Sequence, residues 1–280
     1  MTDLLVTSVT NPRLKALVGL RRRRMRDESG LTVVEGYEEL ALALAAGVRP
    51  QTLFVCPDLF SPSGIAGRQD IGHQDDLVRQ SRTLGSEVVR LSRAAFEKVA
   101  YREGPDGILA VVPTAGRPLS ALDPGPRPLV LVGQGVEKPG NLGAMLRTAD
   151  AAGVAAVVAA DAVTDWGNPN VVRASKGTVF SVPVAAAGTA ETLAWLARHD
   201  IALVVTTPET DLLYTDIDLS GAVAVAVGAE KHGVDDTLLE AAAHRVRIPM
   251  LGRANSLNVA ASAAVVVYEA VRQRGLSRVR

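Results

Sequence analysis

The chain has 280 residues, of which 48% are hydrophobic and 21% charged, and its formal net charge is zero. This composition is typical of an ordered protein with room for two domains, and it excludes an intrinsically disordered chain. A net charge of zero argues against a protein that coats nucleic acid nonspecifically. No apolar run approaches the roughly 20 residues of a membrane span, and the first residues lack the order of a signal peptide, so we expect a cytoplasmic protein.

Metal and disulfide chemistry find little support in the residue types. Cys56 is the single cysteine, which excludes an internal disulfide and a cysteine cluster for zinc. The four histidines show no spacing typical of metal ligands. We therefore predict no metal.

Basic residues crowd the first 26 positions, where only one acidic residue, Asp3, opposes them. A solvated helix face is the ordinary interpretation of such a run. The functional alternative is a set of phosphate contacts, which would make RNA binding depend on salt. The arginines that we single out are Arg21, Arg22, Arg23 and Arg24.

The first 112 residues are predicted to form a small α/β unit. Strands are expected at residues 32–34, 52–55 and 108–112, and helices at 38–46 and 93–100. Residues 61–76 are rich in Ser, Pro, Gly and Gln and are predicted to form a surface loop. Prolines and glycines then interrupt any regular pattern at residues 113–127, which we interpret as an interdomain linker.

From residue 128 onward, short apolar runs alternate with longer amphipathic segments. This is typical of a parallel sheet that is covered by helices on both faces. Strands are predicted at 129–132, 155–159, 201–206, 222–227 and 246–248, and helices at 142–152, 169–175, 190–198, 235–243 and 257–272. We therefore expect an α/β fold with a second domain at residues 128–280.

Three motifs follow the predicted strands of this second domain. The first extends from Glu137 to Arg147 and contains glycines that let the backbone turn, with Asn141 and Arg147 six residues apart. Each of these two residues alone has an ordinary interpretation, as a helix cap or a solvated arginine. The nearby Gly133-Gln134-Gly135 is a poor dinucleotide fingerprint, because Lys138 occupies the position of the third glycine.

The second motif is Gly228-Ala229-Glu230-Lys231-His232-Gly233, directly after an apolar strand. Strand ends of open α/β sheets bind ligands, and glycine exposes backbone groups there. Glu230 could bind an amine or a hydroxyl, or it could support the next helix.

The third motif extends from Ile248 to Ala260 and contains Pro249, Ser256 and Asn258. Ser256 can cap a helix, but a cap does not require Asn258. Pro249 ends the strand and removes one donor, which leaves neighbouring carbonyls free to accept bonds from a ligand amine.

Together the three motifs resemble those of the SpoU (TrmH) family of RNA 2′-O-ribose methyltransferases, within the SPOUT superfamily. The patterns N-x-G-x-x-x-R, G-x-E-x-x-G and I-P-M followed by S-L-N-V-A occur in the order and spacing of that family. The resemblance is strong over residues 128–272. It is weaker over residues 1–112, where NPRLKAL and VVEGYEEL are similar to the opening of an L30e-like RNA-binding domain.

The resemblance implies a knotted (trefoil) methyltransferase domain at 128–280 that binds S-adenosyl-L-methionine and works as a homodimer through this domain. Its implied catalytic residues are Arg147, Asn141, Glu230, Ser256 and Asn258. Its implied cofactor-binding residues are Thr206, Thr207, Gly228, Ala229, Glu230, Ile248, Met250, Ser256 and Leu257. The match RASKG adds Arg173 and Lys176 as candidate RNA contacts, alongside the N-terminal arginines.

Methyl transfer from a sulfonium is a direct displacement, so the enzyme must align donor and acceptor and help to deprotonate a 2′-hydroxyl. Arg147 is a difficult base, because a guanidinium holds its proton above about pH 12. It could instead position the 3′-phosphate while another group accepts the proton, and both roles stay open.

Family members with this two-domain layout more often modify ribosomal than transfer RNA, and some confer antibiotic resistance. The expected substrate is therefore 23S rRNA, with antibiotic resistance as a further possibility. The alternatives are a tRNA 2′-O-methyltransferase, a noncatalytic RNA-binding protein of the same fold, and a nicotinamide-dependent dehydrogenase, which the missing fingerprint glycine disfavours.

Overall fold

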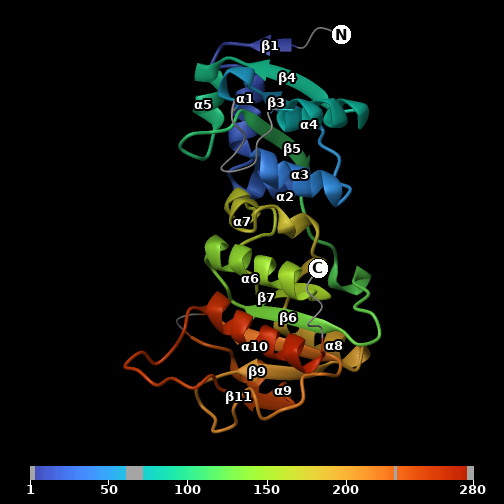
Figure 1. Cartoon of the computed structure of the whole chain (residues 1–280), viewed down its shortest axis with the longest axis vertical. Coiled ribbons are helices and arrows are strands. Elements are labelled where there is room, and N and C mark those ends of the chain that lie inside the picture. Colours follow the sequence, from blue (N-terminus) through green and yellow to red (C-terminus); the bar gives the residue numbers. More distant parts are fainter. Residues whose placement is uncertain (1–3, 61–71, 230–231, 276–280) are drawn as a thin grey trace. The chain divides into compact units, whose positions relative to one another are not determined.

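A computed structural model describes residues 4–60, 72–229 and 232–275 of the chain. It divides into two compact units, one formed by residues 1–115 and 167–181 and the other by residues 116–166 and 182–280. Figure 1 shows their elements. None of the helices in these described ranges is long and apolar enough to cross a membrane.

The described part of the first unit contains one mixed sheet with the strand order β1-β4-β3-β5-β2. The strands are β1 (Leu4–Val6), β2 (Leu31–Glu35), β3 (Thr52–Val55), β4 (Glu87–Leu91) and β5 (Ile108–Pro113). β5 pairs antiparallel with both β3 and β2, whereas β4 pairs parallel with β1 and β3. The buried side chains of Phe54, Phe96 and Leu109 contribute to its core.

Helices and short 3-10 turns surround this sheet. They are α1 (Pro12–Gly19), α2 (Arg23–Ser29), α3 (Tyr37–Ala45), η1 (Pro57–Leu59), α4 (Gly72–Thr83), α5 (Arg93–Val99), α7 (Pro169–Ala174) and η3 (Thr178–Phe180). Asn11 caps α1 through its side chain, and Pro12 supplies the fixed φ that suits a first helical position. Gly30, with φ of 67°, ends α2 and starts the turn into β2.

The described part of the second unit contains a fully parallel sheet with the order β11-β9-β10-β6-β7-β8. The strands are β6 (Leu129–Gln134), β7 (Ala156–Ala160), β8 (Val184–Ala187), β9 (Ala202–Thr206), β10 (Val223–Gly228) and β11 (His244–Val246). The other elements are η2 (Leu119–Ala121), α6 (Pro139–Ala152), α8 (Thr189–Arg198), α9 (Asp236–Ala241) and α10 (Val259–Gln273). Every residue of β6 and β7 is buried, as the short apolar runs predicted.

The predicted α/β class and the mostly parallel sheet are confirmed, but several elements were missed. The missed elements are β1, α1, α2, α4, β4 and β8. Part of the predicted loop at 61–76 is wrong, because residues 72–76 lie in α4, whereas residues 61–71 lie outside the described ranges. α4 escaped detection because its sequence is mainly polar and only a narrow stripe around Leu77 and Val78 is buried.

The segment Gly167–Ser181 belongs to the first unit although it follows β7 of the second. The Thr32 hydroxyl on β2 donates a hydrogen bond to the Gly167 carbonyl. Gly177 has φ of 83°, and a Cβ there would lie 2.7 Å from the Glu39 carbonyl oxygen. The predicted linker at 113–127 contains the first crossing between the units, and the sequence did not indicate the excursion at 167–181.

Arg274, directly after α10, holds the amino ends of the two central strands. Its guanidinium donates to the carbonyls of Arg127 (3.1 Å) and Pro128 (3.0 Å) before β6, and to those of Leu219 (3.2 Å) and Gly221 (2.5 Å) before β10. One side chain thereby fixes the end of the last described helix to the sheet.

We predict that Arg274→Ala lowers the free energy of unfolding by about 2 kcal/mol or more, because bonds from a charged donor are lost and carbonyls lose their partner. Urea denaturation would measure this change. The matched control is Arg198→Ala, which removes an exposed arginine at the end of α8 and is expected to cost about 0.5 kcal/mol or less. Equal losses in the two variants would contradict the structural role of Arg274.

Candidate active site

The carboxyl edge of the parallel sheet gathers three neighbouring strand ends and the turns that follow them. Gly228 at the end of β10 pairs with Gln134 at the end of β6, and Gln134 in turn pairs with Ala160 of β7. β6 lies between β7 and β10 in the sheet, so the chain leaves β6 toward one side of the sheet and later returns to its other side. Ligands of open α/β sheets bind where the chain changes side in this way, outside the carboxyl ends.

The second motif begins with a tight turn in which Gly228 has no room for a side chain. A Cβ on Gly228 would lie 2.0 Å from the carbonyl carbon and 2.1 Å from the carbonyl oxygen of Gly233. The Gly233 N–H donates to the Ala229 carbonyl at 2.9 Å, which closes the turn. Glu230 lies outside the described residues. The turn therefore depends on the absence of a side chain at Gly228.

A glycine on the neighbouring strand end faces this turn. Gly135 has φ of 62°, and a Cβ on it would lie 3.6 Å from the Cβ of Ala229. The two turns thus approach each other closely, with the small methyl group of Ala229 facing Gly135. This arrangement can hold a small molecule through backbone N–H and C=O groups.

The first and third motifs meet through a pair of asparagines. The Asn258 amide nitrogen donates to the Asn141 amide oxygen at 3.1 Å. The Asn258 oxygen accepts from the backbone of Ala260 (3.0 Å) and Ala261 (3.4 Å), so Asn258 also caps α10. Residues 117 positions apart in the sequence are thereby fixed beside each other, at the start of α6 and of α10.

Arg147 lies on α6, about 9 Å along the helix axis from Asn141. Its side chain is exposed, and its guanidinium has no hydrogen-bond or ion-pair partner among the residues that the structure describes. A charged donor in this state is available to a ligand such as a phosphate.

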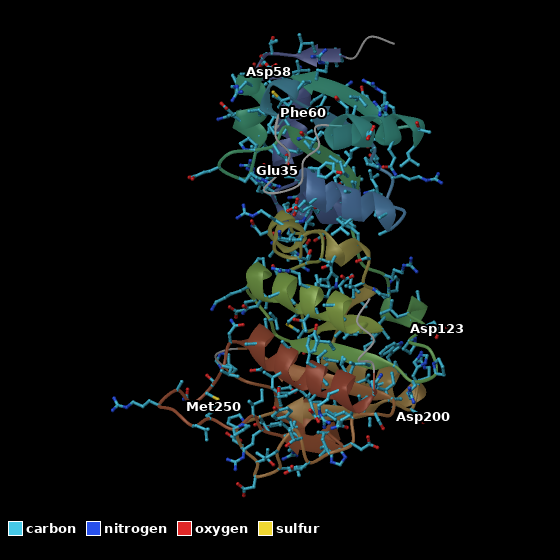
Figure 2. All side chains as sticks on the ribbon, in the orientation of Figure 1. Glu35, Asp58, Phe60, Asp123, Asp200 and Met250 are labelled. Carbon is cyan, nitrogen blue, oxygen red and sulfur yellow. The ribbon has the colours of Figure 1, made fainter. Side chains whose placement is uncertain are left out.

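The other predicted residues of the third motif lie on the loop between β11 and α10. Ile248 is half-buried, whereas Met250, Ser256 and Leu257 are exposed. Figure 2 shows Met250 on this loop, which extends away from the helices of the second unit. The structure places these residues between the end of β11 and the start of α10.

Thr206 ends β9, next to β10, and Thr207 follows it. The Thr206 hydroxyl donates to the Ala226 carbonyl at 3.0 Å, and the Thr207 N–H donates to the Val246 carbonyl at 2.9 Å. Both residues are half-buried, and these bonds tie β9 to its two neighbours. They fix the edge at which a cofactor would bind.

Sequence reasoning missed a buried polar network at the same edge. The Gln134 side chain donates to the Thr189 hydroxyl at 2.8 Å and accepts from the Asp235 N–H at 2.8 Å. The Thr189 hydroxyl donates to the Asp161 carboxylate. The sequence signal for this network is Gln134, which lies between two glycines at a strand end. The comparison with a dinucleotide fingerprint gave no reason for a glutamine at this position.

In the first unit, the N-terminal arginines differ in how their charge is used. The Arg21 guanidinium lies 4.3 Å from the Tyr101 ring centroid and donates to the Val99 and Ala100 carbonyls. Arg23 and Arg24 form exposed ion pairs with Asp27 and Glu28 on the next turn of α2. Arg22 precedes α2 and is exposed.

The RASKG segment lies in the first unit. Arg173 at the end of α7 is exposed. The Lys176 ammonium lies 3.3 Å from the Glu38 carboxylate, and Lys176 has φ of 52°, which few residues other than glycine adopt. This pair is exposed, so water screens it and an incoming phosphate can compete for the lysine.

Two buried carboxyls of the first unit hold the segment that follows α5. Glu35, labelled in Figure 2, accepts from the Tyr101 N–H at 2.7 Å, and Glu39 accepts from the Arg102 guanidinium at 3.3 Å. Burial raises the pKa of both carboxyls, because loss of water outweighs the bonds and the Arg102 charge that favour the ionised form. Their contacts are internal, so we assign them a structural role.

No group of three or more His, Cys, Asp or Glu side chains suited to a metal ion occurs within residues 4–60, 72–229 and 232–275.

Comparisons with known proteins agree with this arrangement. The family model described as the SpoU rRNA Methylase family matches residues 128–268. The model described as the MRM3-like substrate binding domain matches residues 11–110. The chain is similar to the 23S rRNA (guanosine(2553)-2'-O)-methyltransferase RlmP of Bacillus subtilis. The two are 30% identical over 263 aligned residues, which cover 94% of this chain and 97% of that protein.

Solved structures are similar over nearly the whole chain. An AdoMet-bound rRNA methyltransferase from Sinorhizobium meliloti has a TM-score of 0.85 and 28% identity, covering 96% of this chain and 97% of the other. An RNA 2'-O ribose methyltransferase has a TM-score of 0.80 and 39% identity, covering 97% and 99%. The SpoU methyltransferase AviRb from Streptomyces viridochromogenes has a TM-score of 0.83 and 27% identity, covering 96% and 99%. The fold class predicted from the sequence, a knotted methyltransferase domain after a small α/β domain, is confirmed.

We predict that Gly228→Ala destabilises the second unit by about 2 kcal/mol or more, because the new methyl group would overlap the backbone of Gly233 and the turn would have to shift. Urea denaturation would measure the loss. Gly221→Ala is the matched control, since a Cβ at Gly221 meets no atom within 4 Å. A Gly228→Ala protein as stable as the control would show that the turn adapts freely.

Proposed function

Because the chain belongs to the SpoU rRNA methylase family, we propose that it transfers a methyl group from S-adenosylmethionine to a ribose 2′-hydroxyl of 23S rRNA. The observation that carries this proposal is the hydrogen bond between Asn141 and Asn258. It joins two motifs at the carboxyl edge of the sheet, where β6 and β10 end. A dinucleotide-binding protein would have no need of this pair.

The cofactor site lies at the turns after β6, β9 and β10, with the loop before α10 completing it. Gly135 and Gly228 support this assignment, because the missing Cβ of Gly228 lets the turn after β10 close and that of Gly135 lets the turn after β6 approach Ala229. When bound, S-adenosylmethionine supplies an electrophilic methyl group on a positively charged sulfur. The chain contributes Thr206, Thr207, Gly228, Ala229, Ile248, Met250, Ser256 and Leu257, and the assignment of Glu230 rests on the motif alone.

Arg147 is the residue that we assign to the RNA at the reacting nucleotide. Its exposed guanidinium, without a partner in the described ranges, can bind the phosphate next to the target ribose and so align the 2′-hydroxyl. Asn141 and Asn258 hold the starts of α6 and α10 in a fixed relation. Ser256 stands on the loop two residues before Asn258 and completes the assigned set.

The RNA also contacts the first unit in this proposal. Residues 11–110 resemble a substrate-binding domain, and exposed arginines at the start of α2 together with Arg173 and Lys176 supply the positive charge. The similar protein of Bacillus subtilis is named for 23S rRNA, which supports ribosomal over transfer RNA. The protein would meet this RNA in the cytoplasm.

We further propose a homodimer through the second unit. Among the described residues of this unit, four of the five exposed large apolar side chains lie on the loop before α10 and on α10 itself: Met250, Leu251, Leu257 and Tyr268. Exposed apolar side chains of this kind suit a partner surface. Sedimentation velocity would measure the mass in solution. Resistance to a ribosome-targeting antibiotic stays a prediction, which a susceptibility test of expressing cells would check.

Transfer of tritiated methyl groups tests the function directly. The protein is incubated with labelled S-adenosylmethionine and either 23S rRNA or total tRNA, and the labelled site is mapped by primer extension at low deoxynucleotide concentration. We expect incorporation into 23S rRNA and a stop at one nucleotide. Incorporation only into tRNA would overturn the substrate, and cofactor binding without any incorporation would favour a noncatalytic RNA-binding protein.

We predict that Arg147→Ala lowers methyl incorporation about 100-fold or more, because a charged group that aligns the reacting nucleotide is removed. Calorimetry should find the Kd for S-adenosylmethionine within about twofold of the parent, since the assigned partner of Arg147 is the RNA. Arg198→Ala is the control for the loss of one positive charge. Unchanged incorporation in Arg147→Ala would make the catalytic assignment wrong while leaving the family intact.

We predict that replacing Arg22, Arg23 and Arg24 together with alanine weakens RNA binding and flattens its dependence on salt. Each lost phosphate contact lowers the slope of log K against log salt by about 0.7 to 0.9. Arg21 is kept, because its guanidinium packs on Tyr101. Binding is measured by fluorescence anisotropy with an rRNA fragment at several salt concentrations.

The matched control changes the same number of charges elsewhere in the first unit, with Arg79, Arg82 and Arg90 replaced by alanine. All three are exposed on α4 and β4. An equal change of slope in both triple variants would mean that the α2 arginines act only through the overall charge.

A further inference from the structure

Gln134 is a buried glutamine whose amide is engaged at both ends. Its side chain is only 6% exposed, at the last position of the central strand β6. The amide nitrogen donates to the Thr189 hydroxyl, and the amide oxygen accepts from the Asp235 N–H, each at 2.8 Å. A buried amide without such partners would be costly, so these bonds set its orientation.

The orientation of this amide is determined by a chain of hydrogen bonds that ends at the Asp161 carboxylate. The Thr189 hydroxyl donates its one hydrogen bond to the Asp161 carboxylate, so towards Gln134 its oxygen can only accept. The Gln134 nitrogen must therefore face Thr189. Its oxygen is left to face the Asp235 N–H, which can only donate.

Asp235 continues directly from the segment that closes the Gly228 turn. The backbone of Gly233 and Val234 occupies the place that a side chain on Gly228 would need. The next residue is Asp235, whose N–H donates to Gln134. The Asp235 side chain also caps α9 by accepting from the Leu238 N–H at 2.9 Å. Gln134, at the end of β6, thus holds the segment that follows the Gly228 turn on the neighbouring strand β10.

We propose that Gln134 is a positioning residue for methyl transfer, which sets the Gly228 turn against the cofactor by holding Asp235 on one side and Thr189 on the other. This inference rests on the proposed function, because it assigns the turn to S-adenosylmethionine. Through Thr189 and Asp161, the same amide ties the ends of β7 and β8 to the turn. Gln134 touches neither reactant and acts through the backbone that does.

The second unit contains a matched glutamine at the opposite edge of its sheet. Gln273 accepts from the Leu219 N–H at 2.7 Å and donates to the Ile217 carbonyl at 3.1 Å, ahead of β10 rather than after it. Replacing either glutamine with methionine keeps a side chain of similar shape. It removes the amide oxygen that accepts from a backbone N–H and the amide nitrogen that donates a hydrogen bond. Only Gln134 should affect the cofactor.

The experiment compares the parent, Gln134→Met and Gln273→Met as full-length proteins. Calorimetry gives the Kd for S-adenosylmethionine, methyl transfer gives KM for cofactor and for 23S rRNA, and thermal denaturation gives Tm. We expect both variants to lose stability, whereas Kd and KM for the cofactor rise about tenfold in Gln134→Met alone. KM for RNA should stay within about twofold of the parent in both.

Equal cofactor affinity in Gln134→Met and Gln273→Met would overturn the positioning role and leave the proposed function standing. A parent protein that does not bind S-adenosylmethionine would instead overturn the proposed function and this inference with it. The two failures are therefore distinguished by the parent measurement.

A second pair of variants keeps the test valid if Gln134→Met does not fold. Thr189→Val removes the hydroxyl that orients Gln134, whereas Thr189→Ser keeps it. We expect the Kd for S-adenosylmethionine to rise in Thr189→Val and to return toward the parent value in Thr189→Ser. Equal affinities in the two Thr189 variants would contradict the chain of hydrogen bonds.

Discussion

All strands in the described part of the second unit run in one direction, so their carboxyl ends share one edge of the sheet. The pairing of Gly228 with Gln134 then brings the turns after β10 and β6 together. A side chain at Gly228 would force the turn after β10 to shift, because the backbone of Gly233 on the same turn occupies its place. The candidate site thus depends more on the register between β6 and β10, and on the lack of a side chain at Gly228, than on any single hydrogen bond.

The sequence predicted the second unit better than the first. Apolar runs such as residues 223–227 are buried along their whole length, so their shortness and their β-branched residues indicate strands. β4, in contrast, has only five residues and shows neither an apolar run nor a strict alternation, since Val88, Val89 and Leu91 are buried, and α4 is polar except for a narrow stripe. The position of Gly167–Ser181 in the first unit depends on contacts with Thr32 and Glu39, which are distant in sequence and carry no local signal.

For the site, the motifs indicated residue types and the strand ends indicated their location. The bond between Asn141 and Asn258 agrees with the expectation that their motifs meet, although neither motif contains information about the other's position. The Gln134 network was missed because its partners lie at the starts of two different helices. Only the parallel register brings these positions within reach of one amide.

α10 is fixed at both of its ends. Asn258 caps its start and binds Asn141, whereas Arg274 ties its end to the carbonyls that precede β6 and β10. Neither end can fray without breaking a tertiary contact. In terms of amide hydrogen exchange, we therefore expect α10 to belong to the same cooperative unit as the central strands, with amides that exchange when the second unit opens as a whole.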